Sequence, residues 1–344
     1  MLFPHVADKF NLKYGRGLLP ELTGSLDNYL VVTDEFVFEK YKGDLKNNYQ
    51  VYLVSDVEVN TLDAAIKSLD VDKITTVLGL GGGKAVDAGK YMAEHMGKTV
   101  HNFPTVLSVN AAFCFKSAMR IDSVVTYMGR IFPEAIYIDY DIIQSAPKYL
   151  NVAGAADLMS CLTGTYDWKL NSMVTKSHKF SQEVCDGAQV LLGLLAENID
   201  NIKEVNDDGI YFMCEAFRWV AENSAILNHT MWESASEHQT FDNLERICGH
   251  GFLHGQIIAL TTYFMSLFQD NQHERALMMI KRLGIDVSLT ALGLTEDQLR
   301  EGFKTLRWFT EEEKLRYTII QAKPITDEWI DMAVAKYKKD FNIA

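Results

Sequence analysis

Hydrophobic and polar residues follow one period in the first part of the chain and another in the second. Up to about residue 140, short apolar runs rich in β-branched residues alternate with amphipathic segments, a pattern typical of the strands and helices of a parallel sheet. The runs predicted to be strands are residues 29–33, 50–55, 75–80, 99–103 and 135–138. Between them, residues 61–69 and 85–95 are predicted to be helices.

From about residue 146 onward, apolar residues recur at helical spacing and β-branched runs become rare. The clearest predicted helices are residues 186–199, 210–227, 256–268, 295–306 and 326–338. The length of the chain allows two hydrophobic cores. We therefore predict an α/β domain with a parallel sheet over residues 1–145 and an all-helical domain over residues 146–344.

The net charge of −13 argues against a nucleic-acid partner, because phosphate backbones attract clustered Lys and Arg. A phosphorylated small molecule would need only a few local positive groups. No apolar stretch reaches the roughly 18 residues of a membrane span, and the first residues lack the apolar core of a signal peptide. We expect a cytoplasmic protein with five reduced, scattered cysteines, which are Cys114, Cys161, Cys185, Cys214 and Cys248.

Three consecutive glycines connect a predicted strand to a predicted helix. Gly81, Gly82 and Gly83 permit positive φ and let backbone N–H groups approach an anion, while the helix that starts near Lys84 offers the positive end of its dipole. This loop therefore favours a pyrophosphate site. The alternative is a tight strand-to-helix turn that binds no ligand.

Asp34 ends the first of the predicted strands. Its carboxylate could accept hydrogen bonds from the 2′-hydroxyl of a ribose and would repel a 2′-phosphate, which favours NAD over NADP. The alternative is that Asp34 caps the N-terminus of the segment that follows.

The helical half carries three candidate metal ligands: Asp157, His238 and His254. The two histidines stand too far apart for one helix face, but two helices that fold back on each other would bring them together. One carboxylate and two imidazoles would leave a position open for substrate, as in catalytic metal sites. With nine histidines in the chain, and with His250 close to His254, coincidence is the alternative.

Six short motifs are distributed over most of the chain. They are Tyr14-Gly-Arg-Gly, Val32-Thr-Asp34, Gly79-Leu-Gly-Gly-Gly-Lys-Ala-Val-Asp87, Phe103-Pro-Thr105, Ala153-Gly-Ala-Ala-Asp157 and His254-Gly-Gln. Together they resemble the dehydroquinate synthase-like superfamily, which includes iron-containing alcohol dehydrogenases, glycerol dehydrogenases and dehydroquinate synthases. Residues 157–170 and 236–238 look most like its glycerol-1-phosphate dehydrogenase branch.

The resemblance implies an N-terminal dinucleotide-binding domain and a C-terminal metal-binding domain. It implies Asp157, His238 and His254 as ligands of Zn²⁺, or of Ni²⁺ or Fe²⁺, and Asp34 beside the adenosine ribose. The expected reaction is NAD(P)-linked reduction of a small ketone, dihydroxyacetone phosphate to sn-glycerol 1-phosphate, in a homo-oligomer. The residues implied around the dinucleotide are Gly81, Gly82, Gly83, Lys84, Asp87, Thr105 and Ser108.

Three residues depart from the family pattern. Asn110 stands where the dehydrogenases usually carry an Asp near the substrate, bulky Phe113 follows it, and Asp242 stands where many members carry a second His. Asn110 and Lys116 are spaced like an Asp and a Lys of dehydroquinate synthases, so we expect both in catalysis, with a solvated lysine as the alternative for Lys116. A glycerol or polyol dehydrogenase, a carbon–oxygen lyase and a non-catalytic binding protein therefore stay open as alternatives.

Overall fold

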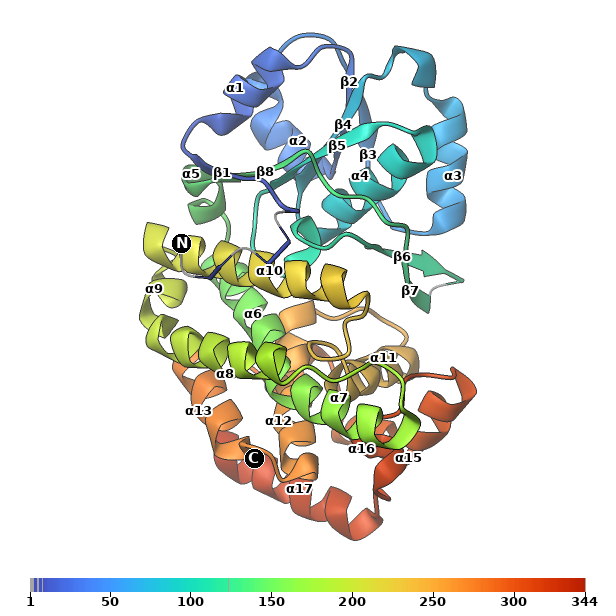
Figure 1. Cartoon of the computed structure of the whole chain (residues 1–344), viewed down its shortest axis with the longest axis vertical. Coiled ribbons are helices and arrows are strands. Elements are labelled where there is room, and N and C mark those ends of the chain that lie inside the picture. The colour runs from blue at the N-terminus through green and yellow to red at the C-terminus, as the bar shows by residue number, and fades with distance from the viewer. Residues whose placement is uncertain (1–2, 5, 8, 123, 344) are drawn as a thin grey trace. The chain divides into compact units, whose positions relative to one another are not determined.

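The computed structural model describes residues 3–4, 6–7, 9–122 and 124–343 (Figure 1). Contacts divide the chain into two compact units. The first runs to Asn151 and also includes Val205–Ile226, and the second comprises Val152–Glu204 and Leu227–Ala344. The domain boundary expected between residues 145 and 146 stays a prediction.

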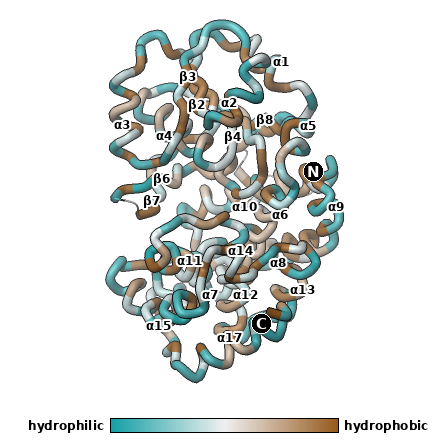
Figure 2. Tube along the Cα trace, turned by 180° about the vertical axis from the view of Figure 1, so that it is seen from behind, coloured by the Kyte–Doolittle hydropathy of each residue, from teal (hydrophilic) through white to brown (hydrophobic). Residues whose placement is uncertain are grey.

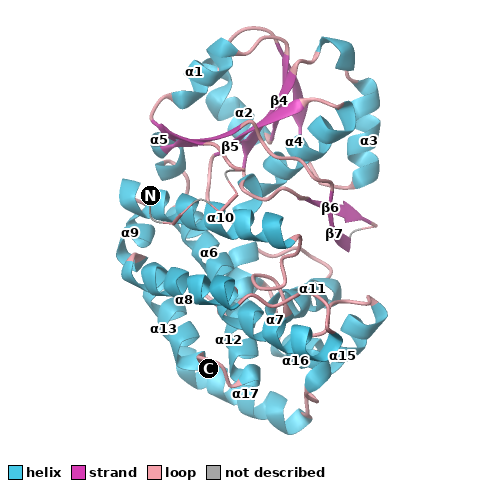
Figure 3. Ribbon diagram, in the orientation of Figure 1, coloured by secondary structure: helices cyan, strands magenta, loops and turns pink. Residues whose placement is uncertain are grey.

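A six-stranded sheet, parallel throughout, forms the centre of the first unit (Figure 3). Its strand order is β1-β8-β5-β4-β2-β3. The five predicted strands are present, and a sixth, β1, was missed because four residues with mixed polarity give no clear period. The strands are β1 Leu12–Gly15, β2 Tyr29–Thr33, β3 Tyr49–Leu53, β4 Thr76–Gly81, β5 Thr99–Pro104 and β8 Ala135–Asp139.

Both faces of this sheet are covered, which explains why its central strands are almost continuously apolar. Side chains of a strand alternate between faces, so Leu30 and Val32 of β2 join one core while Tyr29 and Val31 join the other. The first core packs against α3 (Val59–Ser68) and α4 (Gly83–Met96). The second packs against α1 (Leu18–Ser25) and α2 (Glu35–Tyr41).

The remaining elements of the first unit are short, apart from one long helix, α10 (Asp207–Leu227). The carbonyl oxygen of Phe3 accepts a hydrogen bond from the buried Arg218 of α10, and the Tyr14 hydroxyl donates to Glu215. These contacts group α10 with the sheet, although its sequence neighbours are helices of the other unit. The short elements are η1 Lys42–Asp44, η2 Val71–Lys73, η3 Asn110–Ala112, α5 Tyr140–Gln144 and the antiparallel strands β6 Ser117–Ile121 and β7 Val124–Met128.

The described residues of the second unit form helices and loops without a strand. Its helices are α6 Lys148–Met159, which the division crosses, α7 Cys161–Thr175, α8 Gln182–Glu197, α9 Ile199–Glu204, α11 Ser236–Cys248, α12 His254–Gln269, α13 His273–Leu283, α14 Leu289–Leu292, α15 Glu296–Glu312, α16 Ile319–Ala322 and α17 Asp327–Phe341. The parallel sheet followed by helices confirms the predicted fold class. None of the described helices is long and apolar enough to span a bilayer.

Sequence patterns account for individual helices of the second unit. A capping box starts α15, where the Thr295 hydroxyl accepts from the backbone of Gln298 and the Gln298 side chain accepts from the backbone of Thr295. Along α15, Leu299, Phe303 and Leu306 are buried at helical spacing, and hydrophilic residues are interspersed between the hydrophobic ones (Figure 2). By contrast, α12 is apolar on nearly every side and is buried accordingly.

The close packing of α4 on β4 depends on Gly89. A Cβ atom at this position would lie 3.0 Å from the Cα of Gly79, which is backbone and cannot move aside. We therefore expect Gly89→Ala to lower the free energy of unfolding by about 1–3 kcal/mol, because overpacking displaces the helix. Urea denaturation measures this change. Gly24→Ala is the matched control, since its Cβ would meet nothing within 4 Å, and an equal loss in both variants would contradict the packing argument.

Candidate metal centre and dinucleotide loop

Asp157, His238 and His254 lie together in the second unit. They come from α6, α11 and α12, and one ligand atom from each lies within 4.8 Å of the others. The Nε2 atoms of His254 and His238 lie 3.3 and 3.7 Å from Asp157 Oδ1. Ligand atoms of a tetrahedral ion with bonds of about 2.0–2.1 Å are about 3.3 Å apart. The donor set and its spacing therefore fit a divalent metal ion. Within the described ranges, this is the one such group of His, Cys, Asp and Glu side chains.

A glycine brings the ligand helices together. The Cβ of any residue larger than glycine at position 255 would lie 1.8 Å from the carbonyl oxygen of Ala153. His254, immediately before Gly255, begins α12, and Asp157 lies one turn after Ala153 on α6. This contact explains why small residues accompany both ligands in the sequence.

A second glycine holds the loop that leads into α11. The Cβ of a larger residue at position 164 would lie 2.6 Å from the carbonyl oxygen of Trp232. From the end of α6, the Ser160 hydroxyl donates to the carbonyl oxygen of Glu233. The residues before His238 are therefore fixed against α6 and α7.

Asp167 ties the start of α11 to three other helices. Its carboxylate accepts hydrogen bonds from the backbone N–H of Ser236 at 3.1 Å and of Ile319 at 2.7 Å, and from the Gln269 side chain at 3.0 Å. Burial raises the pKa of Asp167 to about 7, against the opposing effect of these donors, and the nearby Glu237 carboxylate adds to the rise. Sequence analysis missed this role.

In the metal centre, burial and charged neighbours shift the pKa values of His238 and Asp157 in opposite directions. Burial by itself lowers the pKa of His238, but hydrogen bonds to the carboxylates of Asp157 and Glu237 raise it to about 10. Burial by itself raises the pKa of Asp157, because it favours the neutral acid. Contacts with His238 and His254 outweigh burial and hold the pKa of Asp157 well below the usual range. Without metal, these contacts favour the doubly protonated ring of His238, and a metal ion that binds Nε2 must displace one of the two protons.

An aromatic side chain borders the metal cluster. Phe241, one turn further along α11 from His238, lies edge-on to the His254 ring, with ring centroids 5.3 Å apart. His250, the other histidine near this segment, contacts the backbone oxygens of Gly251 and Gly293 instead and is exposed.

Two of the three consecutive glycines, Gly81 and Gly83, have a steric reason. Gly81 has φ of +147°, and a Cβ there would lie 2.8 Å from the Cβ of Ala85. Gly82 is the N-cap of α4, and a Cβ on Gly83 would lie 2.9 Å from the side chain of Val109. The loop thus leaves the first N–H groups of a long helix accessible at the carboxyl end of β4, a geometry that suits a pyrophosphate. Lys84, the second residue of α4, is exposed beside it.

Asp34 caps α2, so the capping interpretation of this residue is confirmed. Its Oδ1 accepts from the backbone N–H of Val37 at 2.9 Å. Its other oxygen, Oδ2, lies 3.5 Å from the position of a Cβ on Gly81. One carboxylate oxygen therefore faces the glycine loop, and contact with a ribose stays a prediction.

A buried lysine links α4 to the loop that follows β5. Lys90 is fully buried, lies 2.9 Å from the Asp87 carboxylate and donates to the carbonyl oxygens of Ala111, Cys114 and Lys116. The carboxylate of Asp87, one of the residues implied around the dinucleotide, is thus occupied with Lys90. Sequence analysis missed Lys90, although its spacing of three residues from Asp87 on a helix was a usable signal.

The other predicted residues of the first unit lie in this same loop. The N–H of Thr105, which is buried, donates to the carbonyl oxygen of Gly81 at 3.0 Å, and Ser108 is half-buried. Asn110 begins η3, and it and Lys116 are half-buried. The structure therefore brings the predicted dinucleotide and catalytic residues together in the first unit.

Phe113 belongs to the loop that follows β5. Its ring is fully buried and packs on Phe217 of α10, with ring centroids 5.5 Å apart. An apolar ring on a loop beside a helix gains more from that core than from a polar pocket. Phe113 therefore serves the packing of the loop.

Residues 11–147 match the family model of iron-containing alcohol dehydrogenases. A glycerol-1-phosphate dehydrogenase [NAD(P)+] of Aeropyrum pernix is 28% identical over 312 residues, covering 87% of this chain and 86% of that protein. The enzyme of the same name from Hyperthermus butylicus is 27% identical and covers 91% of this chain and 90% of that protein.

Solved structures share the fold. A probable glycerol dehydrogenase of Sinorhizobium meliloti superposes with a TM-score of 0.74 at 17% identity, covering 97% of this chain and 98% of that one. Glycerol dehydrogenase of Schizosaccharomyces pombe gives 0.73 at 18% identity, covering 98% and 92%. The chain is thus similar to the iron-containing alcohol dehydrogenase superfamily, the resemblance that its motifs predicted. The curated relatives named above are glycerol-1-phosphate dehydrogenases, the branch that residues 157–170 and 236–238 resemble.

We expect Gly255→Ala to weaken metal binding by at least about tenfold, because the added methyl group forces α12, and with it His254, away from α6. Competition for Zn²⁺ with a chromophoric chelator measures the affinity. Gly193→Ala on α8, where a Cβ would meet nothing within 4 Å, is the control and should bind as the parent does. Equal affinity of Gly255→Ala and the parent would show that the close approach does not set the ligand geometry.

The raised pKa of Asp167 predicts a pH dependence of stability. The folded chain binds this proton more tightly than the unfolded chain, so the stabilisation is complete below about pH 4 and is lost as the pH rises through about 7. Between about pH 5 and about pH 8, the free energy of unfolding should fall more steeply in the parent than in Asp167→Asn, by up to a few kcal/mol. Urea titrations across this range provide the comparison, and parallel pH profiles would refute the assignment.

Proposed function

We propose that this protein is a divalent-metal-dependent, NAD(P)-linked dehydrogenase that reduces a small ketone to an alcohol. The convergence of Asp157, His238 and His254 in one cluster carries the proposal. Three protein ligands leave the fourth position of a tetrahedral ion for a substrate oxygen, which distinguishes catalytic from structural sites. The names of the similar curated proteins support the same class of reaction.

Dihydroxyacetone phosphate is the ketone that we propose, and sn-glycerol 1-phosphate is the product. The support is similarity along most of the chain to proteins named glycerol-1-phosphate dehydrogenase. We assign contacts with the substrate to Asn110 and Lys116, and the Lys116 ammonium group suits a phosphate. Both residues lie in the loop that Lys90 holds.

In this proposal, different residues bind the metal ion and the dinucleotide. Asp157, His238 and His254 would hold the metal ion, and Gly81–Gly83 with the start of α4 would bind the pyrophosphate. When bound, the metal ion polarises the ketone oxygen and the nicotinamide supplies the hydride. We propose NAD as the preferred cofactor, because the Oδ2 of Asp34 beside the glycine loop would repel a 2′-phosphate.

Zn²⁺ is the ion we propose, with Ni²⁺ or Fe²⁺ as alternatives. Two imidazole nitrogens and one carboxylate oxygen suit these borderline ions better than Mg²⁺ or Ca²⁺, which prefer oxygen ligands alone. All five cysteines are free thiols, which supports a reducing compartment such as the cytoplasm. We also expect a homo-oligomer, on the resemblance to the family.

Reduction assays on the Zn²⁺-loaded protein test the function. We expect oxidation of NADH with dihydroxyacetone phosphate, slower oxidation of NADPH, and loss of both on chelation with recovery on adding Zn²⁺. His254→Ala should abolish bound metal and turnover while dinucleotide binding, measured by fluorescence titration, persists. His250→Ala is the control, since that histidine contacts backbone oxygens outside the cluster.

Other outcomes would redirect or reject the proposal. Faster reduction of dihydroxyacetone than of its phosphate would indicate a polyol dehydrogenase. Turnover of a substrate without net change in nicotinamide absorbance would indicate a lyase. Unchanged metal content in His254→Ala would reject the metal site itself.

A further inference from the structure

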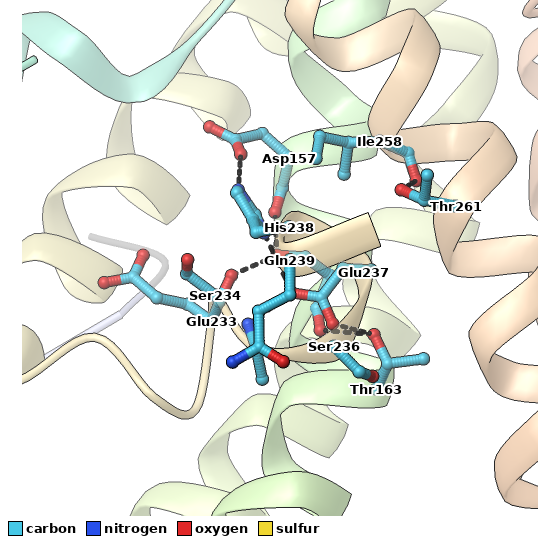
Figure 4. A network of polar contacts seen from close by, with 12 residues as sticks. Asp157, Thr163, Glu233, Ser234, Ser236, Glu237, His238, Gln239, Ile258 and Thr261 are labelled. Carbon is cyan, nitrogen blue, oxygen red and sulfur yellow. Dashed lines mark hydrogen bonds and ion pairs between the residues drawn. The ribbon is translucent and has the colours of Figure 1, made fainter. Parts of the chain in front are cut away.

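The carboxylate of Glu237 accepts hydrogen bonds on both of its oxygens beside the metal cluster. Glu237 is fully buried and directly precedes His238 on α11. Its Oε1 accepts from His238 Nδ1 at 2.8 Å and from the backbone N–H of Ala235 at 2.7 Å. Its Oε2 accepts from the Thr163 hydroxyl at 2.7 Å (Figure 4).

These contacts decide which nitrogen of His238 carries a proton. A backbone N–H can only donate, so Oε1 of Glu237 acts as an acceptor toward Ala235. An ionised carboxylate has no proton to donate, so the ring nitrogen that touches the same oxygen must donate, which places a proton on Nδ1. In the neutral ring the lone pair then belongs to Nε2, the atom that faces Asp157 Oδ1 at 3.7 Å.

We propose that Glu237 is the positioning residue that makes His238 a metal ligand, by holding its Nδ1–H and presenting Nε2 to the ion. This inference rests on the proposed metal site. A carboxylate behind a ligating imidazole fixes the orientation of the ring and increases the basicity of the coordinating nitrogen. Thr163, from α7, holds the other carboxylate oxygen and so fixes the carboxylate in turn.

The start of α11 suits a carboxylate in this position. Glu237 is the second residue of the helix, where free N–H groups and the helix dipole stabilise negative charge. Adjacent residues of a helix ordinarily point in different directions. Here the Glu237 side chain turns back to the N–H of Ala235, the N-cap, and this brings Oε1 against the neighbouring ring.

The Glu237 carboxylate also contributes to the charge balance of the metal site. Asp157 and Glu237 supply two negative charges on either side of the His238 ring. A divalent ion with two neutral imidazoles balances these charges, and buried charges require such pairing. His254 is the more exposed of the two rings, and it lies edge-on to Phe241.

Glu237→Gln tests the proposal, because the amide keeps the shape of the side chain and removes its charge. We expect affinity for Zn²⁺ to fall about 10–100-fold, the visible bands of the Co²⁺-substituted protein to shift, and dinucleotide binding to stay unchanged. Glu245→Gln, two turns further along α11, is the matched control and should behave as the parent does. Parental affinity and parental Co²⁺ bands in Glu237→Gln would overturn the proposal.

Two measurements keep the test decisive if Glu237→Gln fails to fold. In the Zn²⁺-loaded parent, ¹⁵N NMR of His238 should show the proton on Nδ1, and a proton on Nε2 would overturn the proposal. Thr163→Val leaves Glu237 and His238 in place but releases one oxygen, so it should weaken Zn²⁺ binding less than Glu237→Gln does. If the parent itself binds no metal or reduces no ketone, the proposed function fails, whereas a metal-binding parent with an unaffected Glu237→Gln rejects this inference alone.

Discussion

The metal centre depends on a steric constraint, the contact between Gly255 and the backbone of Ala153. Two helices can approach this closely only where one of them has no side chain, and the gap left by a missing Cβ is what lets His254 reach Asp157. At the start of α12, the position of a metal ligand therefore depends directly on the packing of two helices. The same residue that permits the approach stands next to a ligand in the sequence.

Beneath the three ligands lies a layer of hydrogen bonds that orients α11. Asp167 accepts from the first N–H of that helix, and Glu237 accepts from the N-cap and from the ring of His238. Both carboxylates are buried, which costs free energy unless donors surround them. This cost explains why side chains from α7 and α12 and the backbone N–H of Ile319 in α16 converge at one helix terminus.

The sequence predicted the parts that depend on local pattern or on a short motif. Strand β2 was recognisable because five consecutive buried residues leave a continuous apolar run, and the ligand candidates were recognisable from residue type. Contacts that depend on distant packing were not predictable: the ring of Phe113 packs on Phe217 of α10, and the donors around Asp167 come from α11, α12 and α16. The partner of Glu237 was adjacent in sequence, but regular helix geometry gave no reason to expect that contact.

Lys90 holds the loop that carries Asn110 and Lys116 through main-chain carbonyls alone. Carbonyl oxygens are the same in every residue, so this anchor is indifferent to which side chains occupy positions 111, 114 and 116. Substitutions in the loop can therefore alter the chemistry offered to a small molecule while the path of the chain is kept. The substrate specificity of this loop can therefore change during evolution while its backbone conformation stays the same.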